Sequence, residues 1–173
     1  MSASGTALLV IDAQESFRQR PYWNEEKVPL FVTRLQALID GARKRGIPVV
    51  QIFHVEESGV FSVASGYVKT LAGLSIQPEA TFQKRSHSAL IGSGLDVWLV
   101  QHGIRRVIVS GSRLVVILIC GEQPRIRRRG QSTIINSHLQ AVFALNDAEG
   151  IDEIPMSLRS NTLPLNNPQA IRT

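Results

Sequence analysis

The chain begins with an uninterrupted apolar run, Ala7 to Ile11, that stops at a single carboxylate, Asp12. A short continuous hydrophobic run bounded by polar residues is typical of a strand buried on both faces, as in a parallel sheet. Two further runs, Pro48 to His54 and Arg106 to Gly111, predict strands of the same kind. The pattern therefore predicts a parallel sheet with Asp12 at the carboxyl end of its first strand. Open α/β sheets bind their ligands at that edge.

A helical pattern lies between the first two predicted strands. From Val28 to Ala42 the apolar residues recur every three or four positions, which places them on one face of a helix. Pro29 falls in the first turn, where proline is tolerated, and Gly46 followed by Pro48 is a normal helix end. Strand, helix and strand in this order predict a right-handed βαβ unit with parallel strands.

The next part of the chain, up to Gly111, predicts smaller elements. We expect a short helical segment near Val68–Leu71 and a brief strand over Thr81–Lys84 that delivers Lys84 to the strand end. The sequence Ser93-Gly94-Leu95-Asp96 resembles a capping box, with Asp in place of Glu, and predicts a helix that ends at Gly103.

The pattern changes after Gly111. Leu114–Ile119 is apolar and partly β-branched, which favours a strand, and Leu139–Leu145 predicts a short helix. Residues 121–130 are basic and broken by a proline, and residues 151–173 show no sustained period, which predicts a tail. We therefore predict one α/β domain over residues 1–173, a three-layer α/β/α Rossmann-like fold with a mostly parallel sheet, in which residues 112–173 are atypical.

Composition limits the possible classes of protein. Hydrophobic residues make up 43% of the chain and charged residues 19%, as in globular proteins that are soluble. No apolar run approaches the about 20 residues that cross a bilayer, and the N-terminus lacks a leader pattern, so we expect a cytoplasmic protein that binds no membrane.

The single cysteine, Cys120, excludes an internal disulfide and a cysteine-based zinc site. The net charge is +5, but the dense basic cluster Arg125–Arg129 has no interleaved aromatic residue, which favours a solvated loop over nucleic acid binding.

Three positions at the ends of separate predicted elements can carry chemistry: Asp12, Lys84 and the region after Gly111 that contains Cys120. Their order resembles that of the isochorismatase-like cysteine hydrolase family. The resemblance covers about residues 6–111. It rests on three segments: LLVIDAQESF (8–17), Lys84 followed by Ser88-Ala89-Leu90, and GSGLDVWLVQHGIRRVIVSG (92–111).

This resemblance implies a hydrolase that acts on a small carbonyl, amide or vinyl-ether substrate through an Asp–Lys–Cys site. Cys120 would be the nucleophile, Asp12 the base and Lys84 the charge stabiliser. A nearby cation lowers the pKa of a thiol from its usual value of about 8.5, and a carboxylate can accept the thiol proton and return it to a leaving amine. The candidates for lining the substrate pocket are Gln14, Phe17, Trp23 and His54. No cofactor is implied, and relatives commonly self-associate, so we expect a homo-oligomer.

A metal site is not predicted. The nicotinamidase branch of the family would place Asp-x-His at the end of the second strand, where this chain has Ile52-Phe53-His54. His54 is then either a pocket residue or a packed residue at the edge of the sheet.

The cysteine departs from the family pattern. Relatives carry it about six residues after the glycine that ends the strand, a position that Ile117 takes here, whereas Cys120 comes nine residues after Gly111. The alternative function is therefore a catalytically inactive member that serves as an oligomeric or partner-binding scaffold. Each candidate also has a purely structural interpretation: Asp12 as a cap or hydrogen-bond anchor, Lys84 as a surface cation, and Cys120 as a small buried hydrophobe.

Overall fold

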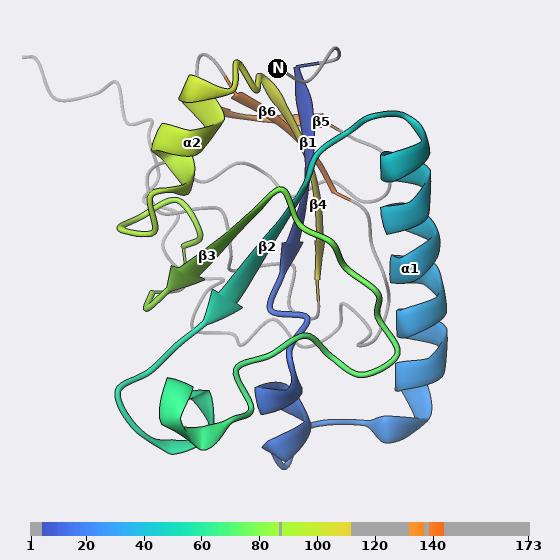
Figure 1. Ribbon diagram of the computed structural model, residues 1–173, viewed down its shortest axis with the longest axis vertical. Helices are drawn as coiled ribbons and strands as arrows, with labels where there is room; N and C mark the ends of the chain where they lie inside the picture. Colours follow the sequence, from blue (N-terminus) through green and yellow to red (C-terminus); the bar gives the residue numbers. More distant parts are fainter. Residues whose placement is uncertain (1–4, 87, 112–131, 137–138, 144–173) are drawn as a thin grey trace, which may run out of the picture.

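The computed structural model describes residues 5–86, 88–111, 132–136 and 139–143 of the chain. These residues form a six-stranded sheet in the order β3-β2-β1-β4-β6-β5 (Figure 1). The strands are β1 (Thr6–Ile11), β2 (Val49–His54), β3 (Ala80–Lys84), β4 (Arg106–Gly111), β5 (Ser132–Asn136) and β6 (Leu139–Phe143). The helices are α1 (Val28–Lys44) and α2 (Leu95–Gln101), with 3-10 turns η1 (Glu15–Gln19), η2 (Glu25–Lys27), η3 (Gly59–Phe61) and η4 (Val63–Ser65).

The order of the strands places a switch point beside Asp12. The chain moves outward from β1 to β2 and β3, then returns through α2 to β4 on the other side of β1. All pairings are parallel except that of β5 with β6. In such sheets the ligand crevice lies at the carboxyl ends of the two strands where the direction of winding reverses. Here those strands are β1 and β4, and Asp12 follows β1 directly.

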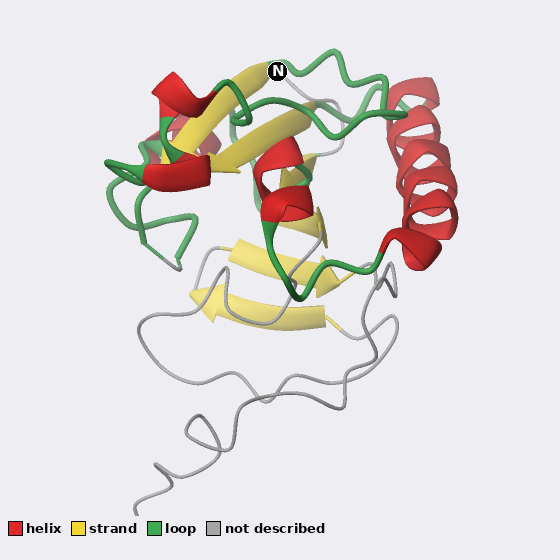
Figure 2. Ribbon diagram, turned by 90° about the horizontal axis from the view of Figure 1, so that it is seen from below, coloured by secondary structure: helices red, strands yellow, loops and turns green. Residues whose placement is uncertain are grey.

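The uninterrupted apolar run of β1 is explained by two cores, one on each face of the sheet. Leu9 and Ile11 pack with residues of α2, whereas Leu8 and Val10 pack with residues of α1. The two helices thus cover opposite faces, and the three-layer α/β fold with a mostly parallel sheet is confirmed. Figure 2, which looks at the carboxyl edge, shows α1 standing to one side of the row of strands. No helix in the described ranges is long and apolar enough to span a membrane.

Three of the local predictions are wrong, and in each case a hydrogen-bonding partner distant in the sequence or a glycine decides the structure. The segment Val68–Leu71 is not helical, because Thr70 forms a bridge with Gln14 and the Leu71 N–H donates to the Ala13 carbonyl. The full capping box does not form, because α2 starts one residue later than the box requires. Its N-cap is Gly94, which has a left-handed φ of 81°, and Ser93 Oγ still accepts from the Leu95 N–H at 3.1 Å.

The predicted helix over Leu139–Leu145 is instead strand β6. Strand β6 pairs in parallel with β4, from Arg106 opposite Gln140 to Val109 opposite Phe143. Without it, the backbone groups along one side of β4 would form an open edge, so strand pairing overrides the local helical pattern. The predicted strand Leu114–Ile119 and the predicted tail 151–173 lie outside the described residues.

We expect α1 to be held to the sheet mainly by its buried apolar face. Replacing fully buried Leu35 by Ala should lower the free energy of unfolding by about 2–5 kcal/mol, because it removes packed methyl groups and leaves a cavity. Leu30→Ala is the matched control on the same helix, since Leu30 is 51% exposed and should change the stability little. Urea unfolding followed by circular dichroism measures both, and equal losses would contradict this account of α1.

Candidate active site

Asp12 leaves the sheet in an unusual backbone conformation. Its φ is +59°, and it is the one described residue other than glycine with a positive φ. Its N–H still donates to the Ile52 carbonyl at 3.0 Å, so the turn begins within the hydrogen bonding of the sheet. Left-handed backbone is uncommon outside glycine, although Asp and Asn tolerate it best, and such residues cluster at functional sites. The turn redirects the Asp12 side chain just beyond the end of β1.

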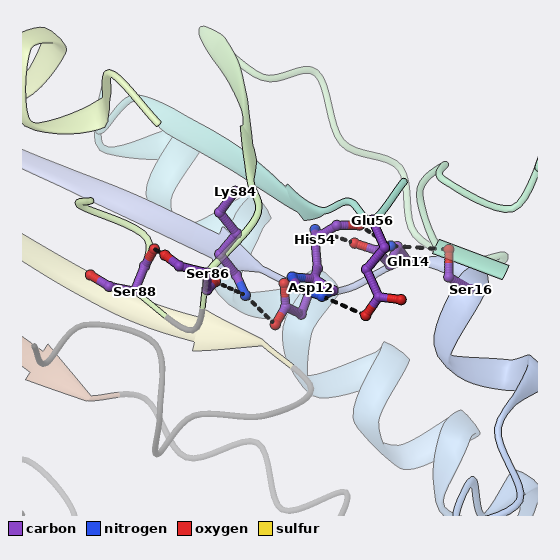
Figure 3. A network of polar contacts seen from close by, with 8 residues as sticks. All are labelled: Asp12, Gln14, Ser16, His54, Glu56, Lys84, Ser86 and Ser88. Atoms are coloured by element: carbon purple, nitrogen blue, oxygen red, sulfur yellow. Dashed lines mark hydrogen bonds and ion pairs between the residues drawn. The ribbon is translucent and has the colours of Figure 1, made fainter. Parts of the chain in front are cut away.

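The Asp12 carboxylate forms an ion pair with Lys84, the last residue of β3. Lys84 Nζ lies 3.1 Å from Asp12 Oδ2 and also donates to the Ser86 carbonyl at 3.4 Å (Figure 3). Both side chains are buried, at 3% and 5% exposed. The interpretation of Lys84 as a surface cation is therefore wrong. Because β2 lies between β1 and β3, the Lys84 side chain spans the width of β2 to meet Asp12.

Burial makes this pair strongly interacting but costly. Two opposite charges attract far more strongly away from water than at a surface. Taking both charges out of water costs much of that attraction, so a buried pair is weak support for a purely stabilising role. Its place at the ligand-binding edge of the sheet instead favours a role in chemistry.

The Gln14 side chain forms hydrogen bonds at the same carboxyl edge of the sheet. Its side-chain amide accepts from the His54 N–H at 2.7 Å and donates to the His54 carbonyl at 3.0 Å, as a neighbouring strand would. The same Nε2 donates to Ser16 Oγ at 3.0 Å, and that hydroxyl donates to the Tyr67 carbonyl at 2.9 Å. The amide of Gln14 thus holds the end of β2 and, through Ser16, the following loop. A contact between Gln14 and a substrate stays a prediction.

His54 stands beside Lys84, because the two residues are partners in the register of β2 and β3. Its Nε2 lies 3.2 Å from Glu56 Oε1, and its ring meets the edge of Phe61 with the centroids 5.3 Å apart. Its buried Nδ1 has no hydrogen-bond partner within the described ranges. The imidazole therefore keeps one polar atom available near the Asp12–Lys84 pair.

The two aromatic candidates differ in their surroundings. Phe17 is buried and packs edge-on against Phe61 at 4.9 Å, which places it in the same aromatic group as His54. Trp23 packs against the core cluster on the α1 side. Its indole N–H is buried and finds no partner among the residues that the structure describes.

With this geometry in view, comparison with known proteins decides the family. The model of the isochorismatase domain matches residues 6–114. The chain belongs to the isochorismatase family. The resemblance noted from the three sequence segments is confirmed, and the family is one of hydrolases.

Solved structures of isochorismatase family proteins share the fold. One isochorismatase family protein superposes with a TM-score of 0.57 at 20% identity, over 65% of this chain and 68% of its own. A cysteine hydrolase from Pseudomonas syringae pv. phaseolicola gives 0.55 at 20% identity, over 62% of this chain and 59% of its own. An isochorismatase from Pseudomonas putida KT2440 superposes with a TM-score of 0.54 at 26% identity, over 65% of this chain and 58% of its own. This chain therefore spans less than two thirds of the length of the last two proteins.

The predicted nucleophile lies outside this picture. The isochorismatase match ends at residue 114, and Cys120 falls outside the described residues. Its role stays a prediction. As for metals, the described part of the chain contains no group of three His, Cys, Asp or Glu side chains that could hold an ion.

Sequence reasoning missed three contributors to this edge of the sheet. Glu56 pairs with the His54 ring and Ser86 accepts from Lys84 through its carbonyl. Each comes two residues after a strand-end candidate, and that spacing is the signal that could have found them. Gly111 is the third. A Cβ at this position would collide with the Ile11 carbonyl oxygen, so β4 can approach β1 beside Asp12 only with glycine there.

We expect the Asp12–Lys84 pair to be energetically coupled. Lys84→Met should cost about 3–5 kcal/mol of unfolding free energy, because it removes the cation beside a buried carboxylate. The double variant with Asp12→Asn should lose less than the sum of the two single variants.

The adjacent Arg85→Met is the matched control. Its side chain is 76% exposed and 3.9 Å from Glu57, and exposed pairs of this kind contribute little. A cycle of chemical unfolding curves measures the coupling. If Lys84→Met lost no more unfolding free energy than Arg85→Met, the energetic coupling of Asp12 and Lys84 would be contradicted.

Proposed function

We propose that this isochorismatase family member hydrolyses a small carbonyl, amide or vinyl-ether compound, with Asp12 as base, Lys84 as charge stabiliser and Cys120 as nucleophile. The observation that carries the proposal is the buried ion pair of 3.1 Å between Asp12 and Lys84 at the switch point of the sheet. Parallel sheets bind their ligands at this edge, and an acid–base group needs a position within reach of the proton that it transfers.

For an amide, each step balances with these three side chains and one water. The Asp12 carboxylate takes the thiol proton, and the thiolate forms a C–S bond to the carbonyl carbon. The tetrahedral intermediate collapses, the C–N bond breaks, and the leaving amine takes the proton from Asp12. Water then adds to the thioester and gives its proton to Asp12. The C–S bond breaks to release the acid, and the thiolate recovers its proton. The Lys84 ammonium stabilises the negative charge on Asp12 and on the thiolate throughout.

Hydrolysis of a vinyl ether requires fewer catalytic side chains than hydrolysis of an amide. Its hydrolysis proceeds by protonation of carbon and addition of water, so the Asp12 carboxyl and a water molecule suffice without a thiol. The displaced position of Cys120 therefore does not weigh against this substrate class.

We assign the recognition of substrate to the group around His54. His54 Nε2 pairs with the Glu56 carboxylate, so in the neutral ring the buried Nδ1, which has no partner among the described residues, can accept a hydrogen bond from a bound molecule. Phe17 contributes an apolar wall through its contact with Phe61. Gln14 and Trp23 complete the proposed lining. Gln14 acts mainly by fixing the His54 backbone, which it holds through two hydrogen bonds.

We expect Asp12→Asn to lower kcat/KM by at least about 100-fold, the scale of a lost acid–base group. Asparagine keeps the size of the side chain and tolerates the left-handed backbone, so the fold should form, at a cost in stability because Lys84 loses its charged partner. The assay uses a panel of small primary amides together with isochorismate.

The control is Asp40→Asn on α1, whose carboxylate is 50% exposed and should leave turnover unchanged. If Asp12→Asn turned over every substrate as fast as the unmodified protein, Asp12 would not be the base.

A second candidate function is an inactive family member that acts as an oligomeric or partner-binding scaffold. The observation that favours it is the spacing in the sequence. Ile117 stands six residues after Gly111, and Cys120 stands nine residues after it. A thiol at the wrong distance from Asp12 would leave the amide reaction without its nucleophile.

Labelling of the single thiol separates the two candidates. In the active protein, iodoacetamide should modify native Cys120 quickly, because reaction requires an accessible thiolate, and amide turnover should fall in proportion. Intact-mass spectrometry follows the one expected adduct. The scaffold function would be supported instead if Cys120 resisted iodoacetamide in the native protein, reacted fully after denaturation, and no substrate were turned over.

A further inference from the structure

We propose that this protein carries a second ligand site, at the amino-terminal edge of the sheet, which takes a small flat organic cation. A cavity of about 320 Å³ lies there, a volume at the lower end of the range for small-molecule sites. Val49 opens β2, Glu79 precedes β3 and Ile104 precedes β4, and all three line the cavity. Asp12 follows β1 and Lys84 ends β3, so both lie at the opposite edge, to which the strand arrows of Figure 1 point, and the two sites are distinct.

Two stacked aromatic rings belong to one wall of the cavity. Trp98 and His102, one turn apart on α2 and at its end, stack with ring centroids 4.1 Å apart and planes inclined by 21°. Phe82 meets the Trp98 ring edge-on at 6.4 Å and fixes it from the sheet side. Val49 and Ile104 are buried and contribute an apolar floor. A planar ligand of similar width can stack on such a wall.

Two polar groups of the lining, on His102 and Glu79, can accept hydrogen bonds from a ligand. His102 Nδ1 lies 2.8 Å from the Trp98 carbonyl oxygen, and because a carbonyl only accepts, Nδ1 must carry the proton. In the neutral ring Nε2 is then an acceptor. Within the described ranges it has no hydrogen-bond partner and is not buried, so it faces open space.

Glu79 adds a negative charge at the rim. Its side chain is exposed, and in the described part of the chain no cation lies within ion-pair distance of it. Its backbone is fixed, because its N–H donates to the Val49 carbonyl at 2.8 Å. A carboxylate, an imidazole acceptor and an indole in one lining together favour a ligand that brings N–H donors and positive charge. Amidinium, guanidinium and aromatic ammonium compounds have this chemistry.

Benzamidine is the probe, and its neutral analogue benzamide, of nearly the same shape, is the matched ligand. Calorimetric titration of the full chain should show saturable millimolar binding of benzamidine that is about tenfold tighter than that of benzamide. Glu79→Gln should weaken benzamidine about three- to fivefold. Glu57→Gln, whose side chain is 92% exposed elsewhere on the surface, should not.

Asp12→Asn is the control for the other edge and should leave the affinity for benzamidine unchanged. The proposal fails if benzamide binds as well as benzamidine, or if Glu79→Gln has no effect in a protein that unfolds like the unmodified one. It also fails if Asp12→Asn abolishes binding, which would place the probe at the catalytic edge, or if no saturable binding occurs at millimolar concentration. None of these outcomes depends on whether the protein has hydrolase activity.

Discussion

A buried charge pair between the ends of two strands that are not neighbours is the constraint on which the site depends. Asp12 follows β1 and Lys84 ends β3, and the full width of β2 separates them. Their contact at 3.1 Å requires that the chain turn sharply after β1 and that the Lys84 side chain cross the end of β2. Asp12 meets the first requirement with its left-handed backbone. The second is met where β2 ends at His54, whose backbone Gln14 holds from the side.

The same constraint explains why polar side chains serve as backbone partners here. After Asp12 the first strand no longer runs beside β2, so the N–H and C=O of His54 would lose their neighbours. The amide of Gln14 supplies one acceptor and one donor in their place. Buried backbone groups require such partners, and a side chain that supplies both lets the sheet open locally without leaving groups unpaired. At this edge of the sheet, hydrogen bonds from the Gln14 side chain therefore replace those of a neighbouring backbone.

The sequence predicted the elements whose pattern is local and uninterrupted, and it predicted the ends of those elements well. Strands β1, β2 and β4 and helix α1 follow from apolar runs and from a regular period, and these place Asp12 at a ligand-binding edge. The contact between Asp12 and Lys84 could be suggested only by family resemblance, because it joins residues 72 positions apart across an intervening strand. Thr70 and β6 were assigned wrongly because their conformations depend on partners distant in the sequence, Gln14 and β4. The pairing of Glu56 with His54 involves only a short spacing, but its geometry depends on how β2 ends.

One contact has a consequence for how the two sides of the sheet hold together. Strands β6 and β5 connect to β1 only by way of β4, and β4 lies against β1 with the α-carbon of Gly111 too near the Ile11 carbonyl for any side chain. Any other amino acid at this position would push the end of β4 outward, and β6 and β5 would move with it. A single methyl group at residue 111 would increase the separation of β4 from β1 next to Asp12. The absence of a side chain at residue 111 therefore sets the alignment of the whole far side of the sheet, even though Gly111 has no functional group of its own.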